Sequence, residues 1–158
     1  MNENSPGNPL DRVSTLTFDI FGTVLDLAGS IVPPLEEILR SCEAHESITG
    51  ANVWSHWRQR QRIEQYQDNL LMLGHSGYQA VMKRALLYSL RTLKIEFTYK
   101  QIDELMKAYQ GLTPFQDAID SLKRLGTKYQ LVILSNGEGR YLEHLVKNRI
   151  GIDFHAIL

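Results

Sequence analysis

Four polar residues that could carry out chemistry stand in two short segments of the sequence. Asp19 and Thr23 lie in the segment FDIFGT, and Ser135 and Asn136 lie in the segment LSNG. A carboxylate such as that of Asp19 can form a covalent ester with a carbon electrophile, or an acyl phosphate with a phosphoryl group. Backbone N–H groups in the turn after Asp19 could hold the anion of a substrate. These residue types indicate a covalent site, and an Asp that only caps a turn is the alternative.

Each segment follows a short apolar run, at 16–18 and at 131–134, and each run predicts a buried strand. Each segment therefore places polar side chains at the carboxyl end of a strand. In open α/β sheets ligands bind at that edge. We expect the four polar residues to meet there, with the side chains of Asp19 and Ser135 within about 10 Å of each other, since both must contact one small anion.

The composition is that of a soluble globular protein, with 158 residues, 43% hydrophobic, 22% charged and a net charge of -1. This charge gives no reason to expect nucleic acid or a membrane surface as a partner. No apolar stretch approaches the roughly 20 residues of a membrane span. Residues 1–12 are polar and predict a disordered leader rather than a secretory signal. With Cys42 as the single cysteine, no intrachain disulfide can form and a cytoplasmic location is expected.

The stretch between the two segments reads as helical from about residue 30 to residue 112. Pro33 and Pro34 predict the start of its first helix, because proline is tolerated in a first turn. Asn52 is a predicted N-cap for a long helix over 53–72. A third helix is expected over 78–93. Thr98 and Gln101 then have the spacing of a capping box for a helix that ends near residue 111.

The remainder alternates helices and strands. Thr113 and Pro114 predict the cap and first residue of a helix that Gly126 ends. A strand over 130–134, a helix over 140–148 and the start of a third strand over 152–158 follow. This alternation predicts an α/β protein with a doubly wound, Rossmann-like parallel sheet.

These segments resemble the motifs of the haloacid dehalogenase superfamily. In that family a strand ends in Asp, two residues later come Gly and Thr, and a second strand ends in Ser or Thr. Asp19, Gly22, Thr23 and Ser135 occupy those positions. The family also inserts a helical cap after the first strand. The resemblance therefore implies a haloacid dehalogenase-like core, incomplete here, that comprises residues 13–29 and 113–158, with a helical cap over 30–112.

The residue two positions after the Asp distinguishes branches of this family. Phosphatases usually carry a second Asp there to protonate the leaving oxygen, whereas this chain has Phe21, and a halide needs no proton to leave. The chain is thus similar to the type II 2-haloacid dehalogenases, which act on the L enantiomer. Their first long cap helix carries a Trp-Arg-Gln similar to Trp57, Arg58 and Gln59. Tyr78 falls where an aromatic residue lines their halide pocket.

The resemblance implies that Asp19 displaces the halide from C2 of a 2-haloacid and that water cleaves the resulting ester. It implies a small-molecule substrate, no cofactor and no metal, and it leaves a homodimer open. A solvated helix face remains the alternative for Arg58, since Arg60 and Arg62 alternate with it. The implied groups for the substrate carboxylate are Thr23, Ser135 and backbone amides near Ile20, Phe21 and Asn136; those for the halide side are Arg58, Asn136, Gln59 and Tyr78.

Two further motifs of the family, a Lys and a group of acidic residues, follow its third strand. No Lys or Asp before Leu158 can be assigned to them. We therefore expect the front portion of a longer enzyme, with low stability and little or no steady-state turnover. Two alternatives remain open: a Mg²⁺-dependent phosphatase of the same superfamily, and a truncated relative that has no catalytic activity.

Overall fold

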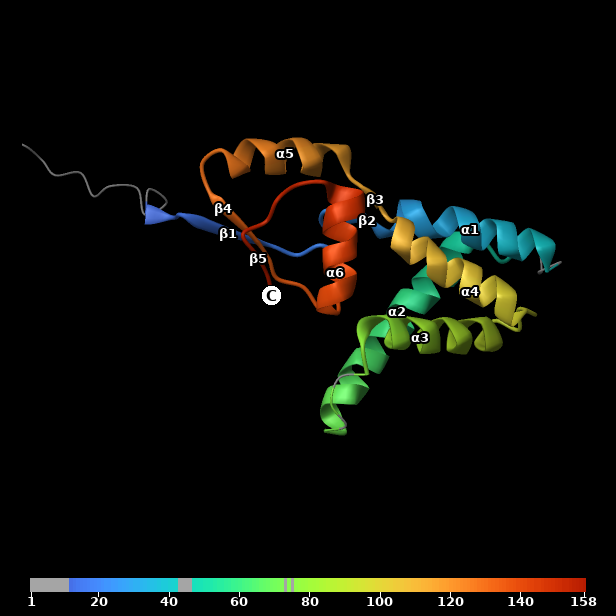
Figure 1. Cartoon of the computed structure of the whole chain (residues 1–158). Coiled ribbons are helices and arrows are strands. Elements are labelled where there is room, and N and C mark those ends of the chain that lie inside the picture. Colours follow the sequence, from blue (N-terminus) through green and yellow to red (C-terminus); the bar gives the residue numbers. More distant parts are fainter. Residues whose placement is uncertain (1–11, 43–46, 73, 75) are drawn as a thin grey trace, which may run out of the picture.

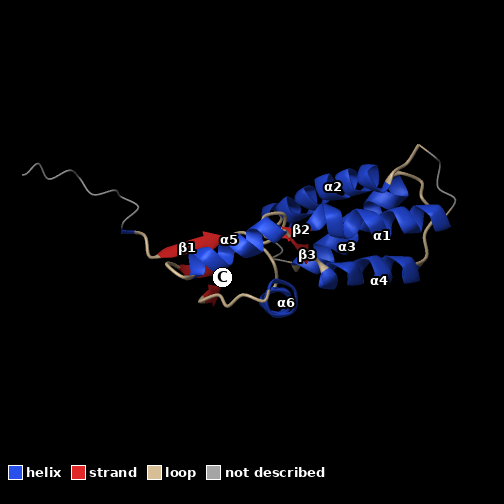
Figure 2. Ribbon diagram, turned by 90° about the horizontal axis from the view of Figure 1, so that it is seen from above, coloured by secondary structure: helices blue, strands red, loops and turns tan. Residues whose placement is uncertain are grey.

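The computed structural model describes residues 12–158 except 43–46, 73 and 75, and leaves the side chains of residues 68 and 69 undescribed. Residues 1–11 of the predicted leader therefore lie outside the described residues. Figures 1 and 2 show an elongated arrangement, with a small sheet toward one end and a group of helices toward the other. The two parts meet near the short strands β2, Leu25–Asp26, and β3, Thr113–Pro114.

The sheet is parallel, as the sequence predicts. Its strand order is β1-β4-β5, and Phe18 of β1 lies opposite Ile133 of β4. Helix α5 lies beside the strands in both ribbon views and buries Ile119 and Leu122 (Figures 1 and 2). The prediction of an α/β fold is confirmed. The elements of this part are β1 at Thr15–Phe18, α5 at Gln116–Gly126, β4 at Gln130–Ile133, α6 at Gly139–Leu145, a π-helical turn at Val146–Ile150 and β5 at Ala156–Ile157.

The region between β2 and β3 is helical and packs into a bundle (Figure 2). Antiparallel pairing of β2 with β3 brings the two ends of this region together, with Leu25 opposite Pro114. The chain thus leaves the sheet and returns to it at one place. The elements of the bundle are α1 at Leu27–Ser41, α2 at Gly50–Leu70, α3 at Tyr78–Thr92, α4 at Tyr99–Ala108 and a 3₁₀ turn, η2, at Tyr109–Gly111.

Helix α1 begins earlier than the prolines predict. Asp26 is its N-cap and accepts a hydrogen bond from Gly29 N at 2.8 Å, so Pro33 and Pro34 lie inside the helix. The prediction that they open the helix is therefore wrong. The physical reason is burial along one face, which outweighs the loss of two backbone donors. The buried positions of α1 recur every four residues: Leu27, Ile31, Leu35 and Leu39.

The N-cap predicted for α2 is also displaced. Thr49 Oγ1 accepts from Asn52 N at 3.2 Å, and Asn52 Oδ1 accepts from Thr49 N at 3.2 Å. This reciprocal pair makes Thr49 the cap and puts Asn52 in the first turn, as in a capping box. Glu36 of α1 also accepts from Gly50 N at 2.6 Å. The helix therefore begins at Gly50 because a second helix supports its start.

The capping box of α4 is confirmed, since Thr98 and Gln101 exchange both hydrogen bonds. The helix predicted from Thr113 and Pro114 is corrected: these two residues form β3, and α5 begins at Gln116. Thr113 N donates to Ser30 Oγ at 2.9 Å, so tertiary contacts hold this segment extended. The helix predicted over 140–148 begins at residue 139 and changes to π-helix after residue 145.

Trp57 of α2 provides a test of the bundle. Its side chain is fully buried, and its Nε1 donates to the Met82 carbonyl of α3 at 2.8 Å. We expect Trp57→Phe to lower the free energy of unfolding by about 2 to 4 kcal/mol, because it opens a cavity and removes a buried hydrogen bond between α2 and α3. Trp54→Phe, at a partly exposed position of the same helix, should cost less than about 1.5 kcal/mol. Equal losses in urea unfolding would contradict this view of the bundle.

Candidate functional site

The carboxylate of Asp19 lies directly after β1, at the carboxyl edge of the sheet. The side chain is exposed, and Thr23 Oγ1 donates a hydrogen bond to Asp19 Oδ2 at 3.1 Å. This bond leaves the other oxygen, Oδ1, available and fixes the plane of the carboxylate. A nucleophile needs this kind of orientation toward its electrophile.

The turn after Asp19 owes its shape to Gly22. Its φ is +88°, a conformation that side chains disfavour, and its N–H donates to the Leu25 carbonyl at 2.9 Å. Val24 N and Leu25 N both donate to the Ile20 carbonyl, at 3.1 and 2.9 Å. The turn therefore closes on itself and brings Thr23 back to the carboxylate. Ile20 itself is buried, so only its backbone can serve a ligand at this edge.

Ser135 lies at the same edge because β1 and β4 run parallel. Leu134 N donates to the Phe18 carbonyl at 2.9 Å, which places Leu134 beside Asp19 and Ser135 one residue further along. The Ser135 hydroxyl is buried and has no hydrogen-bond partner. Asn136 follows on the exposed part of the loop. The structure thus brings Asp19 and Ser135 to adjoining strand ends, as the two segments predict.

Aromatic rings connect the turn after Asp19 to the helical bundle. Phe21 stacks on Tyr78, the first residue of α3, with ring centroids 4.4 Å apart and planes 9° apart. Tyr141 of α6 stacks on the same Phe21 ring at 5.9 Å. The Tyr78 and Tyr141 rings also stack on each other, with centroids 6.3 Å apart. The three rings therefore form one cluster, an apolar wall beside the nucleophile candidate that joins the bundle to the sheet region.

Arg58 of α2 belongs to the same neighbourhood. Its Nη1 donates to Gln61 Oε1, and its guanidinium lies 5.5 Å from the centre of the Trp54 ring. Burial raises the pKa of Tyr78, the positive charge of Arg58 opposes this rise, and the negative charge of Asp19 adds to it. Arg58 and Asp19 therefore both lie close enough to the Tyr78 hydroxyl to act on it. This proximity favours a site role over the solvated-face alternative.

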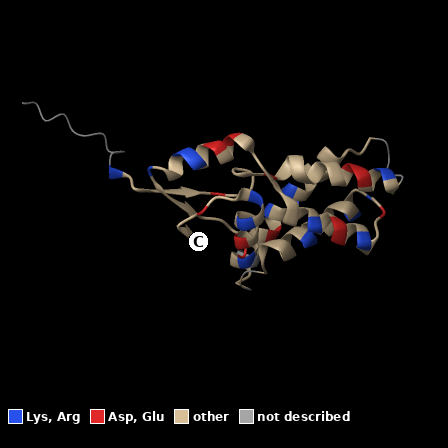
Figure 3. Ribbon diagram, turned by 45° about the horizontal axis from the view of Figure 1, so that its top comes forward, with Lys and Arg blue, Asp and Glu red and all other residues tan. Residues whose placement is uncertain are grey.

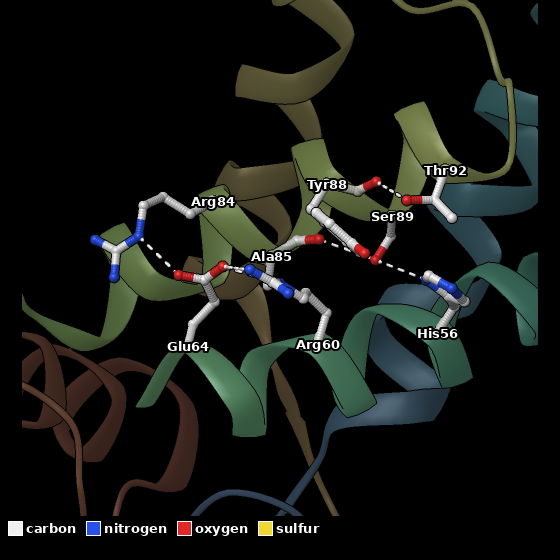
Figure 4. Close-up of polar contacts among 8 residues, drawn as sticks. All are labelled: His56, Arg60, Glu64, Arg84, Ala85, Tyr88, Ser89 and Thr92. Carbon is white, nitrogen blue, oxygen red and sulfur yellow. Dashed lines mark hydrogen bonds and ion pairs between the residues drawn. The ribbon is translucent and has the colours of Figure 1, made fainter. Parts of the chain in front are cut away.

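The orientation of α2 depends on polar contacts with α3 (Figure 4). Glu64 bridges two arginines, with Arg60 Nη2 at 2.6 Å and Arg84 Nε at 3.2 Å. Arg60 also lies over the Tyr88 ring, 4.0 Å from its centre. One turn earlier, His56 Nδ1 lies 3.2 Å from the Ser89 hydroxyl (Figure 4). Because these groups tie α2 to α3, they fix the rotation of α2 and hold Arg58 on a different face.

The structure does not bring Gln59 to this neighbourhood. Gln59 is exposed and lines a surface pocket with His56, Arg60 and Tyr88. Gln61, only 1% exposed, is the glutamine that accepts a hydrogen bond from Arg58. On a helix, residues three apart share a face and adjacent residues do not. The placement of Gln59 on the halide side therefore disagrees with the geometry, and helical spacing from Arg58 could have identified Gln61.

Four buried polar atoms in the described part of the chain have no hydrogen-bond partner. They are Ser135 Oγ, Glu138 Oε2, Tyr78 Oη and Tyr109 Oη. Two lie in the loop after β4, and the two tyrosines are close enough for the charge of one to affect the other. The Tyr78 hydroxyl has Gln61 and Arg58 within hydrogen-bonding influence, so the two atoms of the loop, Ser135 Oγ and Glu138 Oε2, are the ones that indicate a place where a polar ligand or water binds.

The charges of the molecule are mixed. Figure 3 shows both kinds of charge, Lys or Arg and Asp or Glu, on helices of the sheet region and of the bundle. Among the described residues, no group of three or more His, Cys, Asp or Glu side chains is arranged to hold a metal ion. None of the described helices has the length and apolar character needed to cross a membrane.

Comparison with known proteins agrees with the resemblance seen in the sequence. The chain is 31% identical over 139 residues to (S)-2-haloacid dehalogenase 4A of Burkholderia cepacia, and 26% identical over 140 residues to the (S)-2-haloacid dehalogenase of Pseudomonas sp. strain YL. These matches cover 87% and 88% of this chain but 56% of each relative. The chain thus spans little more than half the length of the curated relatives it matches. No protein-family model matches it.

Solved structures show the same likeness in fold. The L-2-haloacid dehalogenase of Xanthobacter autotrophicus superimposes with a TM-score of 0.76 at 28% identity, covering 92% of this chain and 56% of that one. The same enzyme with chloropropionic acid covalently bound gives 0.71 at 27% identity, with the same two coverages. The fold is that of the haloacid dehalogenases, and the resemblance inferred from the sequence is confirmed.

The buried tyrosines near the site lead to a pH prediction. Burial raises the pKa of Tyr109 well above its ordinary value, and the nearby Tyr78 adds to the rise. A raised folded-state pKa means that stability is fully present below the unfolded value of about 10 and is lost as pH rises above it. We expect the free energy of unfolding to fall above about pH 10, and to fall less steeply in Tyr109→Phe.

Urea unfolding from pH 8 to 11 would measure this change. Tyr99→Phe is the matched control, because Tyr99 is 69% exposed. An identical pH dependence in Tyr109→Phe and in the unmodified protein would show that Tyr109 does not contribute to it.

Proposed function

We propose that this chain carries the nucleophile and halide side of an enzyme that removes halide from (S)-2-haloacids through an ester on Asp19. One observation carries the proposal: a carboxylate oriented by Thr23 at the sheet edge shares the surroundings of Tyr78 with the guanidinium of Arg58. The pairing of a nucleophile with a cation beside an apolar wall suits a substrate whose leaving group departs as an anion.

In the first step, Asp19 Oδ1 attacks C2 of the haloacid from the side opposite the halogen. The O–C2 bond forms, the carbon–halogen bond breaks, and its electron pair leaves with the halide, so C2 is inverted and no proton is transferred. Thr23 holds Oδ2 and directs the other oxygen at the substrate. The covalently bound chloropropionic acid in the similar Xanthobacter enzyme supports a covalent intermediate.

The substrate carboxylate would bind at the loop after β4. The buried Ser135 hydroxyl lacks a partner, and its donation to a carboxylate oxygen would satisfy it. Backbone amides near Ile20, Phe21 and Asn136 are the other proposed donors, because the turn after β1 and the loop after β4 leave the sheet at adjoining strand ends. Binding at these positions would hold C2 near Asp19 without adding a charged side chain beside the nucleophile.

The halide would leave toward Arg58 and Asn136, with Tyr78 lining its path. Arg58 is positioned by Gln61 and Trp54, and its charge stabilises the anion as it forms. We therefore replace Gln59 by Gln61 in the proposed halide side. The stacked ring of Phe21 keeps the surroundings apolar, which strengthens the attraction between the guanidinium and the departing ion.

In the second step, water attacks the acyl carbon of the Asp19 ester. The bond between the acyl carbon and the former Oδ1 breaks, and the bond between C2 and that oxygen survives. The hydroxyl oxygen of the 2-hydroxyacid therefore comes from Asp19, and the water oxygen remains in the carboxylate. One proton of the water ends on the new hydroxyl and the other is released to solvent. No metal takes part in the proposed chemistry. The phosphatase alternative needs an oxygen ligand and acid two residues after Asp19, whereas Phe21 offers an aromatic ring that stacks on Tyr78.

Loss of the nucleophile is the direct test. We expect Asp19→Asn to lower halide release from (S)-2-chloropropionate at least about a thousandfold, because an amide is a far weaker nucleophile than a carboxylate. Single-turnover chloride release, together with mass spectrometry of the peptide that contains Asp19, would detect the first step alone. Asp153→Asn, at an exposed position, is the control and should match the unmodified protein. Halide release from Asp19→Asn at the unmodified rate would refute the proposal.

The two glutamines of α2 provide a matched pair. Gln61→Ala should lower single-turnover halide release by about tenfold, because it removes the hydrogen bond that orients Arg58. Gln59→Ala, at an exposed position two residues away, should change it by less than about twofold. Arg58→Gln should cost about a hundredfold. A larger loss of halide release in Gln59→Ala than in Gln61→Ala would show that Gln59, as the sequence indicates, and not Gln61 belongs to the halide side.

A further inference from the structure

Helix α3 begins without a capping side chain of its own. Its N-cap is Gly77, and its first turn contains no acidic residue. The first N–H groups of a helix need acceptors, and side-chain caps usually bond the second or third residue. In α3 that second residue is Gln79, whose N–H donates to Glu138 Oε1 at 3.3 Å. The cap of this helix therefore comes from a residue 59 positions away.

The side chain of Glu138 caps α3 rather than α6, the helix that follows Glu138 in the sequence. Glu138 is the N-cap of α6, yet its side chain makes no capping hydrogen bond there. The carboxylate instead points across to α3, and its second oxygen, Oε2, is buried without a partner. A carboxylate at a helix N-terminus is also favoured by the helix dipole, so the charge stabilises this contact.

A side chain at Gly77 would displace the Glu138 carboxylate from this contact. A Cβ on Gly77 would lie 2.6 Å from Glu138 Oε1, and the φ of +88° also favours glycine. Glycine at position 77 therefore permits the close approach of the carboxylate to the start of α3. This contact joins the loop that carries Ser135 and Asn136 to the helix that begins with Tyr78.

We infer that Glu138 is a positioning residue that caps α3 from the sheet region and so holds Tyr78, and with it the α2–α3 pair, over Asp19. Tyr78 is the first residue of α3 and stacks on Phe21, so a shift of this helix end moves the aromatic wall directly. Such a shift would also move Arg58, because side-chain contacts tie α2 to α3. The capping contact itself is independent of the proposed function. Only the roles of Tyr78 and Arg58 in halide release rest on it.

Other hydrogen bonds join α6 and the π-helical turn after it to the end of the bundle. The Tyr141 hydroxyl donates to the Tyr109 carbonyl at 2.8 Å, and Arg149 Nε donates to the Leu112 carbonyl at 2.8 Å. These bonds hold the segment that returns to the sheet. Glu138 holds the start of α3 beside this segment, where the Gln79 side chain also accepts a hydrogen bond from Gln110 Nε2 at 3.4 Å. Loss of Glu138 should therefore loosen α3 and Tyr78 while the connection between the two parts stays in place.

Hydrogen exchange measures the contact without reference to activity. In Glu138→Ala we expect the Gln79 amide to exchange about tenfold faster, as loss of a hydrogen bond to a charged group implies. Glu138→Gln keeps an acceptor oxygen and should stay within about threefold of the unmodified protein. Glu143→Ala, at an exposed position of α6, is the control and should change nothing. Unchanged exchange at Gln79 in Glu138→Ala would overturn the inference.

Single-turnover chloride release then tests the positioning role. Glu138→Ala should raise the half-saturating concentration of (S)-2-chloropropionate by about tenfold, and Glu138→Gln should restore most of the loss. A positioning role would be contradicted if Glu138→Gln impaired chloride release as much as Glu138→Ala while the Gln79 amide of Glu138→Gln exchanged at the normal rate. If the unmodified protein released no chloride, the proposed function would fail, and the exchange experiment would still decide whether Glu138 caps α3.

Discussion

The parallel pairing of β1 with β4 is the constraint on which the rest of the site depends. Only a parallel register puts the ends of both strands at one edge, and here Phe18 lies opposite Ile133. The residues that follow, Asp19 on one strand and Ser135 on the other, then emerge beside each other. An antiparallel pairing of the same two strands would send them to opposite edges, and no loop could bring them back.

A second constraint is the way the helical bundle approaches that edge. The bundle leaves and rejoins the sheet region through the paired strands β2 and β3, so its base is fixed but its far end is free of the sheet. Contacts from α6 and from the loop before it supply further ties, among them Tyr141 to the Tyr109 carbonyl and Glu138 to Gln79 N. Where the bundle approaches the sheet edge, Phe21 stacks with Tyr78 of α3 and with Tyr141 of α6.

Local signals predict helix boundaries only where no distant group competes with them. The capping box of Thr98 and Gln101 is local, and it forms as the sequence indicates. Thr113 and Pro114 also look like a helix start, but pairing with β2 and the bond from Thr113 N to Ser30 hold them extended. At α2, Glu36 from another helix supports a start earlier than Asn52. These differences arise from tertiary contacts that exceed local propensities.

The sequence by itself determined the alternation of strands and helices, the parallel sheet, the two polar segments and the likeness to the haloacid dehalogenases, because periodicity and short motifs are local properties of the chain. Only the tertiary structure decided which side chains meet. The rotation of α2 selects Gln61 over Gln59 as the partner of Arg58, and packing of α3 against the loop after β4 makes Glu138 its cap. Such choices depend on rigid-body packing between elements far apart in sequence, which one-dimensional spacing does not encode.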